Sequence, residues 1–60
     1  MMLFRIKSHL TMNTYVYFIY LGEKKDKYGN NIYLAYSLKN KTIVDMIFHP
    51  KMLPSFEKLS

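Results

Sequence analysis

Residues 15–21 read YVYFIYL, a run of seven uncharged side chains of which four are aromatic. Aromatic and β-branched residues in such a run favour a strand that is apolar on both faces. The whole chain has 60 residues, and a domain of about this size buries only ~60% of the surface that its unfolded form exposes. We therefore predict a single small domain over residues 1–60 whose second strand carries more apolar surface than one core covers.

The segment before this run predicts a first strand. Apart from Leu3 and Ser8, residues 2–13 alternate between apolar and polar side chains with a period of two, which is the strand period. A helix that uses Leu3, Ile6 and Leu10 is the alternative. Asn13 and Thr14 separate this segment from the central run, so we expect a hairpin.

The segment after the run predicts a second hairpin. Residues 22–31 contain both glycines of the chain and several charges, which is typical of a loop. Alternation over 31–38, a polar turn at 39–41 and β-branched residues in 42–49 then predict two more strands. The alternative is an α+β fold with residues 43–49 helical, because the spacing after Thr42 matches a helix cap.

Two prolines set the limits of the last elements. Pro50 ends the fourth element, and Pro54 is placed to begin one helical turn before the C-terminus. The predicted fold is therefore mainly β: a small antiparallel four-stranded meander or partly closed barrel with a short C-terminal helical turn.

The register of the first hairpin decides which side chains share a face. With a two-residue turn at 13–14, Met12 would face Tyr15, and the sheet would have a core face and a reverse face. Because the chain offers no long helix to cover the reverse face, we predict that it binds a partner. In the alternative, a barrel-like sheet encloses this face itself. The predicted partner-binding residues are Arg5, Lys7, His9, Val16, Phe18 and Tyr20.

The composition favours a binding protein. Six tyrosines and five methionines belong to residue types enriched in interface cores. The chain has no cysteine, so oligomerisation or a bound partner is the remaining way to support so small a core. We predict a cytoplasmic protein, with no membrane association, that forms a homodimer or docks on a larger protein. Its Lys- and Asn-rich composition fits an inhibitor or regulator encoded by a phage or mobile element.

The net charge of +5 supports an alternative, a basic nucleic-acid-binding module. Five of the nine cations fall in predicted turns, where lysines commonly serve solubility, and the chain has one arginine for bidentate phosphate contacts. For these two reasons we rank protein binding above nucleic-acid binding. The predicted nucleic-acid residues are Arg5, Lys7, Tyr20, Lys24, Lys25 and Lys27.

The sequence does not predict an enzyme, a cofactor or a metal site. The four acidic residues show no spacing typical of an acid–base pair, and His9 and His49 belong to no cluster of ligand residues. The alternative is a small toxin-like ribonuclease, whose chemistry would depend on four side chains: Arg5, Lys7, His9 and Tyr20.

Overall fold

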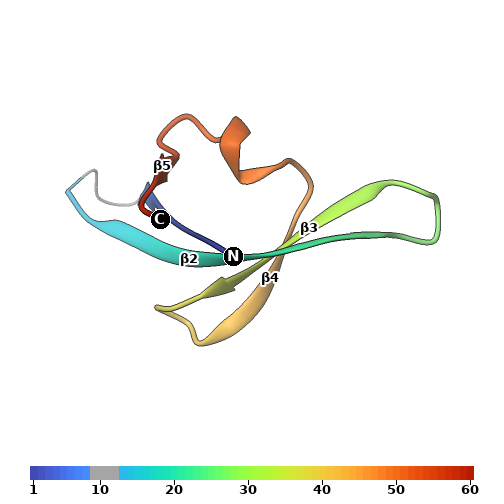
Figure 1. Cartoon of the computed structure of the whole chain (residues 1–60), viewed down its shortest axis with the longest axis horizontal. Coiled ribbons are helices and arrows are strands. Elements are labelled where there is room, and N and C mark those ends of the chain that lie inside the picture. The colour runs from blue at the N-terminus through green and yellow to red at the C-terminus, as the bar shows by residue number, and fades with distance from the viewer. Residues whose placement is uncertain (9–12) are drawn as a thin grey trace.

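Strands dominate the chain, and the predicted mainly β class is confirmed. The computed structural model describes residues 1–8 and 13–60. In this part of the chain five strands form one antiparallel sheet with the order β4-β3-β2-β1-β5 (Figure 1). The elements are β1 (Met2–Lys7), β2 (Tyr15–Lys25), β3 (Asn31–Ser37), β4 (Thr42–Met46), the 3-10 turn η1 (Pro50–Met52) and β5 (Glu57–Lys58).

The hairpin of β2 and β3 is longer than predicted. Residues 22–25, which were predicted to form a loop, continue strand β2 after a bulge between Tyr20 and Gly22. Gly22 has a φ of 133°, a conformation that favours glycine. At the tip, the Asp26 carboxylate accepts hydrogen bonds from the backbone N–H groups of Tyr28 and Asn30 at 2.8 and 2.9 Å. The result is a two-stranded arm that projects along the 37 Å long axis (Figure 1).

Strand β4 excludes the helical alternative for residues 43–49. Ile43 lies opposite Tyr36, and Val44 lies opposite Ala35. Cross-strand pairs of β-branched and aromatic side chains stabilise a sheet, and here they outweigh the local helix-capping pattern. The strand ends at Met46, three residues before its predicted end, and the chain bends towards Pro50.

The C-terminal segment, residues 47–60, departs furthest from the prediction. Pro50 begins η1, a position at which the backbone N–H of other residues has no partner within the helix, so the proline loses no hydrogen bond. His49 Nδ1 accepts a hydrogen bond from the Lys51 N–H at 3.1 Å. The predicted C-terminal helical turn is present as η1, but it precedes Pro54 instead of following it. Pro54 lies in a turn that the Phe56 N–H closes on the Leu53 carbonyl at 3.1 Å, and the chain then extends into β5, which pairs antiparallel with β1.

The core lies between the sheet and the C-terminal segment, which arches over one side of the strands (Figure 1). Phe4 and Ala35 are fully buried, and Phe18 is 8% exposed. The ring of Phe4 contacts the rings of Phe18 and Phe56, with centroid separations of 5.3 Å to each. Because Phe56 comes from the C-terminal segment, that segment completes the core.

Candidate functional site

The first hairpin has a different register from the predicted one. Lys7 lies opposite Tyr15, where the two-residue turn would have placed Met12. This is a shift of five positions, and an odd shift exchanges the faces of one strand relative to the other, because side chains alternate along a strand. The predicted grouping of Val16, Phe18 and Tyr20 on one face with the cations of β1 is therefore wrong.

The side of the sheet beneath the C-terminal segment is here called the inner face. It holds the three β2 residues that were predicted to bind a partner: Val16 and Tyr20 pack against the core, and Phe18 is part of it. The ring of Tyr20 lies 5.0 Å from the ring of His49, centroid to centroid, and burial raises the pKa of the Tyr20 hydroxyl. A single copy of the chain thus covers these side chains with its own C-terminal segment.

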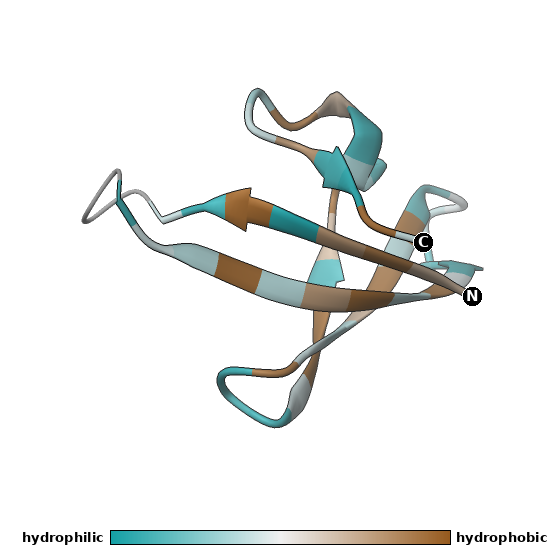
Figure 2. Cartoon of the chain, turned by 60° about the vertical axis from the view of Figure 1, so that its left-hand side comes forward, coloured by the Kyte–Doolittle hydropathy of each residue, from teal (hydrophilic) through white to brown (hydrophobic). Residues whose placement is uncertain are grey.

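The opposite side of the sheet is here called the outer face. The strand registers align four of its residues in one row across β1 to β4, in the order Leu3, Ile19, Tyr36 and Ile43. Ile43 is 56% exposed, and the other three are half-buried. Figure 2 shows that hydrophobic and hydrophilic residues follow one another along the long strands. This row is the apolar centre of the candidate site.

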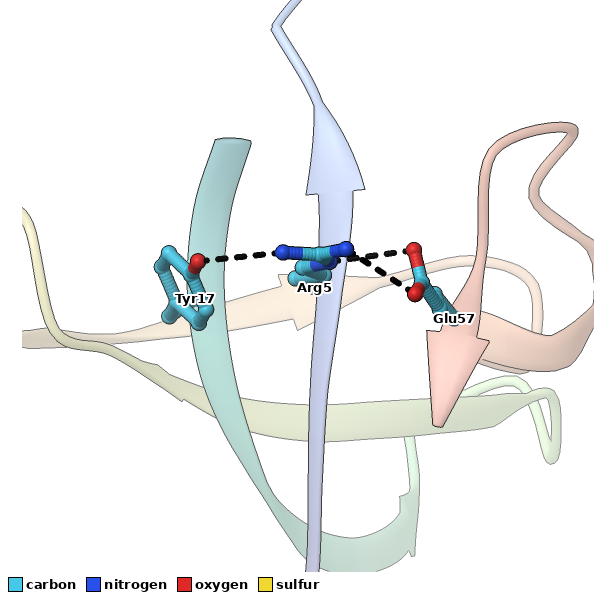
Figure 3. Close-up of polar contacts among 3 residues, drawn as sticks. All are labelled: Arg5, Tyr17 and Glu57. Atoms are coloured by element: carbon cyan, nitrogen blue, oxygen red, sulfur yellow. Dashed lines mark hydrogen bonds and ion pairs between the residues drawn. The ribbon is translucent and has the colours of Figure 1, made fainter. Parts of the chain in front are cut away.

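Arg5 joins this row to the edge of the sheet (Figure 3). Its guanidinium donates to both carboxylate oxygens of Glu57, from Nε at 3.0 Å and from Nη2 at 2.9 Å, and Nη1 donates to the Tyr17 hydroxyl at 3.3 Å. The guanidinium also lies 3.9 Å from the centroid of the Tyr15 ring. These contacts fix Arg5 in place, lower the pKa of Glu57 and raise that of Arg5, with the Arg5–Glu57 hydrogen bonds as the largest cause of both shifts.

The residues predicted for nucleic-acid binding do not form one surface. Lys24, Lys25 and Lys27 lie at the tip of the β2–β3 arm, about 30 Å along β2 from Tyr15 at ~3.3 Å per residue. Tyr20 is on the inner face, whereas Arg5 and Lys7 are on the outer face. His9 lies outside the described residues. The structure therefore keeps Arg5 and Lys7 together, places the three lysines at the distant arm tip and puts Tyr20 on the other face.

Seven outer-face residues of the candidate site were not predicted from the sequence. Four are the members of the apolar row, and the others are Tyr15 and Tyr17, which surround Arg5, and Glu57, which pairs with it. The apolar character of β2 on both faces gave no signal for choosing between the odd and even positions. Glu57 was expected in the C-terminal tail, and no local pattern connects it with a residue 52 positions away.

An open hollow lies beside the hairpin arm and is lined by Asp26, Asn30, Asn31, Ile32 and Ile47. The single acid in it, Asp26, already accepts the backbone N–H groups of the hairpin tip, and these hydrogen bonds lower its pKa. The carboxylate thus stabilises the turn. Among the described residues, no three His, Cys, Asp or Glu side chains come together as metal ligands would.

The architecture defines the chain as a small, open, antiparallel β protein. No family model, curated protein or solved structure matches the chain. Within the described part of the chain, the structure contains no helix with the length and apolar character needed to cross a membrane.

Proposed function

We propose that this chain is a small cytoplasmic, non-enzymatic binding protein that acts through protein–protein contacts on the outer face of its sheet. The observation that carries the proposal is the apolar row Leu3, Ile19, Tyr36 and Ile43 on the face opposite the C-terminal segment. Four strands at a spacing of about 4.8 Å and about five residues of length give the whole outer face, charged residues included, an area of roughly 300 Å². The row is the apolar centre of this area, and the largest apolar patch on a monomer is often functional.

The total exposed surface supports the proposal. The chain exposes 4628 Å², whereas a compact monomer of 7.2 kDa exposes about 4,100 Å². The excess is therefore roughly 500 Å². Part of it comes from apolar residues beside the row, since Tyr17 is 37% exposed and Leu38 is 43% exposed. A partner on the outer face would cover these side chains.

The charges around the row indicate the chemistry of the partner. Lys7, Lys39 and Lys41 lie at the end of the sheet where β1 and β3 terminate. Arg5, in contrast, is already neutralised by Glu57. The complementary surface is therefore an apolar patch with an acidic rim on a larger protein, which agrees with an inhibitor or regulator encoded by a phage or mobile element.

The test is a binding measurement with a purified partner. Immobilised chain captures candidates from a host extract, and the affinity of each purified candidate is then measured by titration calorimetry. The variant Ile19→Ser combined with Leu38→Ser should weaken binding at least tenfold while the β-type circular dichroism is kept, because it removes two apolar contacts without touching the core.

Tyr28→Ser is the matched control, because Tyr28 is 77% exposed at the hairpin tip, away from the row. It should leave the affinity unchanged. Equal loss of affinity in both variants, or full affinity in the double variant, would contradict the assignment of the outer face.

One observation favours a second candidate function. Tyr15 and Tyr17 lie beside Arg5 and Lys7 on the outer face, so cations and aromatic rings do share a surface, although not the predicted one. Single-stranded nucleic acids bind such surfaces by base stacking and phosphate contacts. Under this alternative, a short oligonucleotide binds at low salt and loses affinity steeply as salt is raised. No binding at low salt would eliminate it.

A further inference from the structure

The two edges of the sheet differ in how their backbone groups are used. Along the edge of β1, the Lys7 N–H donates to Ser55 Oγ at 2.9 Å, and the Leu3 carbonyl accepts from the Leu59 N–H at 2.8 Å. The Leu3 N–H donates to Ser60 Oγ at 3.3 Å, and β5 pairs with the middle of the strand. The C-terminal segment therefore closes this edge along most of its length.

Strand β4 forms the opposite edge, and β3 is its only strand neighbour in the described part of the chain. Natural edge strands are commonly protected from pairing by short length, charged side chains, a proline or a bulge. Strand β4 is five residues long and carries one charge, Asp45, but its sequence TIVDM contains neither proline nor lysine, and its register with β3 is continuous. Ile43, one of its two outer-face residues, is 56% exposed. Apart from Asp45 and its short length, this edge therefore has the features of a pairing strand.

We propose that β4 pairs antiparallel with β4 of a second copy of this chain, about a two-fold axis at Ile43. The contact is isologous, so it closes as a dimer and does not extend into a filament. Backbone hydrogen bonds between the two edges supply the association, as in other strand-addition complexes. Because β4 has only five residues, the interface is small and the dimer dissociates on dilution.

Charge complementarity selects both the partner and the register. A two-fold axis normal to the sheet keeps each side chain on its own face, so a residue can lie only opposite a position of the same parity. With the axis at Ile43, Val44 lies opposite Thr42 of the second copy, and Asp45 lies beside the end of its 38–41 turn, where Lys41, with a φ of 55°, precedes the strand. The two opposite charges are therefore neighbours, with Lys41 contributed by the turn and not by the strand. An axis at Val44 would place Asp45 against the apolar Ile43. An axis at Asp45 would bring two carboxylates together, which is unfavourable.

This inference goes beyond the proposed function and does not depend on it. Pairing at the β4 edge leaves the outer face uncovered and places the two apolar rows end to end, with one Ile43 beside the other. A dimer would therefore present a partner with one continuous surface of twice the length. Loss of self-association and loss of partner binding are separate results, measured on different variants.

Cysteine cross-linking tests the register directly, because the native chain contains no cysteine. Directly opposed residues have Cβ atoms about 4.5–5.5 Å apart, within reach of a disulfide after small adjustments. Under mild oxidation Ile43→Cys should form a disulfide-linked dimer. Two Asp45→Cys side chains would be separated by about four residues, or roughly 13 Å, and should not link. Ile47→Cys, at a position 75% exposed beyond the strand, controls for random collision.

Sedimentation equilibrium supplies the second test. The native chain should show a mass that rises from one copy to two with concentration. Asp45→Asn should weaken the dimer roughly 2- to 30-fold, because two exposed ion pairs are lost at about 0.2–1 kcal/mol each. Exchange of the charges, Lys41→Asp with Asp45→Lys, should restore it.

Three results would overturn the proposal. One is a single-copy mass at every concentration, and another is cross-linking of Ile47→Cys as fast as that of Ile43→Cys. The third is tighter association of Asp45→Asn, which would show that Asp45 guards the edge against pairing.

Discussion

The ring of Phe56 should account for most of what the C-terminal segment contributes to the stability of the fold, and Phe56→Ala tests this. Phe56 is half-buried, and its ring centroid lies 5.3 Å from that of the fully buried Phe4. Burial of a Phe side chain contributes about 1.5–3 kcal/mol, and a favourable aromatic pair adds about 0.5–1.5 kcal/mol. Since the burial of Phe56 is partial, we expect the substitution to cost about 2–3 kcal/mol. A core of this size supplies only ~3–5 kcal/mol, so most of the stability is lost.

The assay is urea unfolding followed by far-ultraviolet circular dichroism at low protein concentration. A small domain unfolds with a slope of about 1 kcal/mol per molar urea, so the midpoint should fall by roughly 2–3 M. Phe48→Ala is the matched control, because Phe48 is in the same C-terminal segment but is 66% exposed. Its free energy of unfolding should change by no more than about 0.5 kcal/mol.

Equal shifts for Phe56→Ala and Phe48→Ala would refute the reasoning. So would a cost below about 0.5 kcal/mol for Phe56→Ala, because the sheet would then be stable without its aromatic cover. The first result would mean that the contact of Phe56 with Phe4 contributes no more than an exposed ring does. The second would mean that the C-terminal segment adds little to the stability of the core.

Three further predictions use the same unfolding assay or hydrogen exchange. Gly22→Ala should lower the free energy of unfolding by about 1–3 kcal/mol. Gly22 has a φ of 133°, and a Cβ there would meet no atom within 4 Å, so the cost is backbone strain alone. An unchanged urea midpoint would show that the bulge relaxes. Arg5 holds the pKa of Glu57 below 4.5, so the ion pair contributes stability above about pH 4.5 that is lost as the pH falls through the folded value. The native midpoint should therefore drop more on acidification than that of Glu57→Gln, and parallel pH profiles would contradict this. Asp26→Ala removes the acceptor of two backbone N–H groups at the hairpin tip, so those amides should exchange faster while β1 amides do not change.

Local patterns predicted the strands whose pairing partners are close in sequence. Alternation over 31–38 and the β-branched pair Ile43–Val44 were enough to place β3 and β4, because a short turn joins them. The same patterns overestimated the loop at 22–31. Gly22, which was predicted to be a loop residue, pairs with Leu34 directly after the bulge at Leu21, and the strand continues beyond it.

The candidate site could not be predicted because register depends on the length of the connection. Both odd and even positions of β2 are apolar, so no pattern of polarity shows which set faces inward. A two-residue turn at 13–14 gave one parity, whereas the observed pairing of Lys7 with Tyr15 gives the other. The covered and uncovered faces were therefore exchanged along β2.

The position of β5 also lies outside the reach of local patterns. Glu57 and Lys58 form a strand because Arg5 and Phe4 lie opposite them, and nothing in the two residues themselves favours a strand. Lys and Glu have low strand propensity, so the pairing is a tertiary effect. The bidentate Arg5–Glu57 contact fixes where the C-terminal segment meets the sheet.

The length of the C-terminal segment explains why this segment covers only the inner face. To pass from β4 to the far side of β1, the chain must cross four strand spacings, or about 19 Å. Residues 47–56 span at most about 35 Å when extended, and part of that length is used in η1 and its bends. One crossing of the inner face therefore consumes the segment before β5 begins. Since β2 is apolar on both sides, the outer face keeps apolar surface that residues 47–58 do not cover, and this is the surface that a partner would bury under the proposed function.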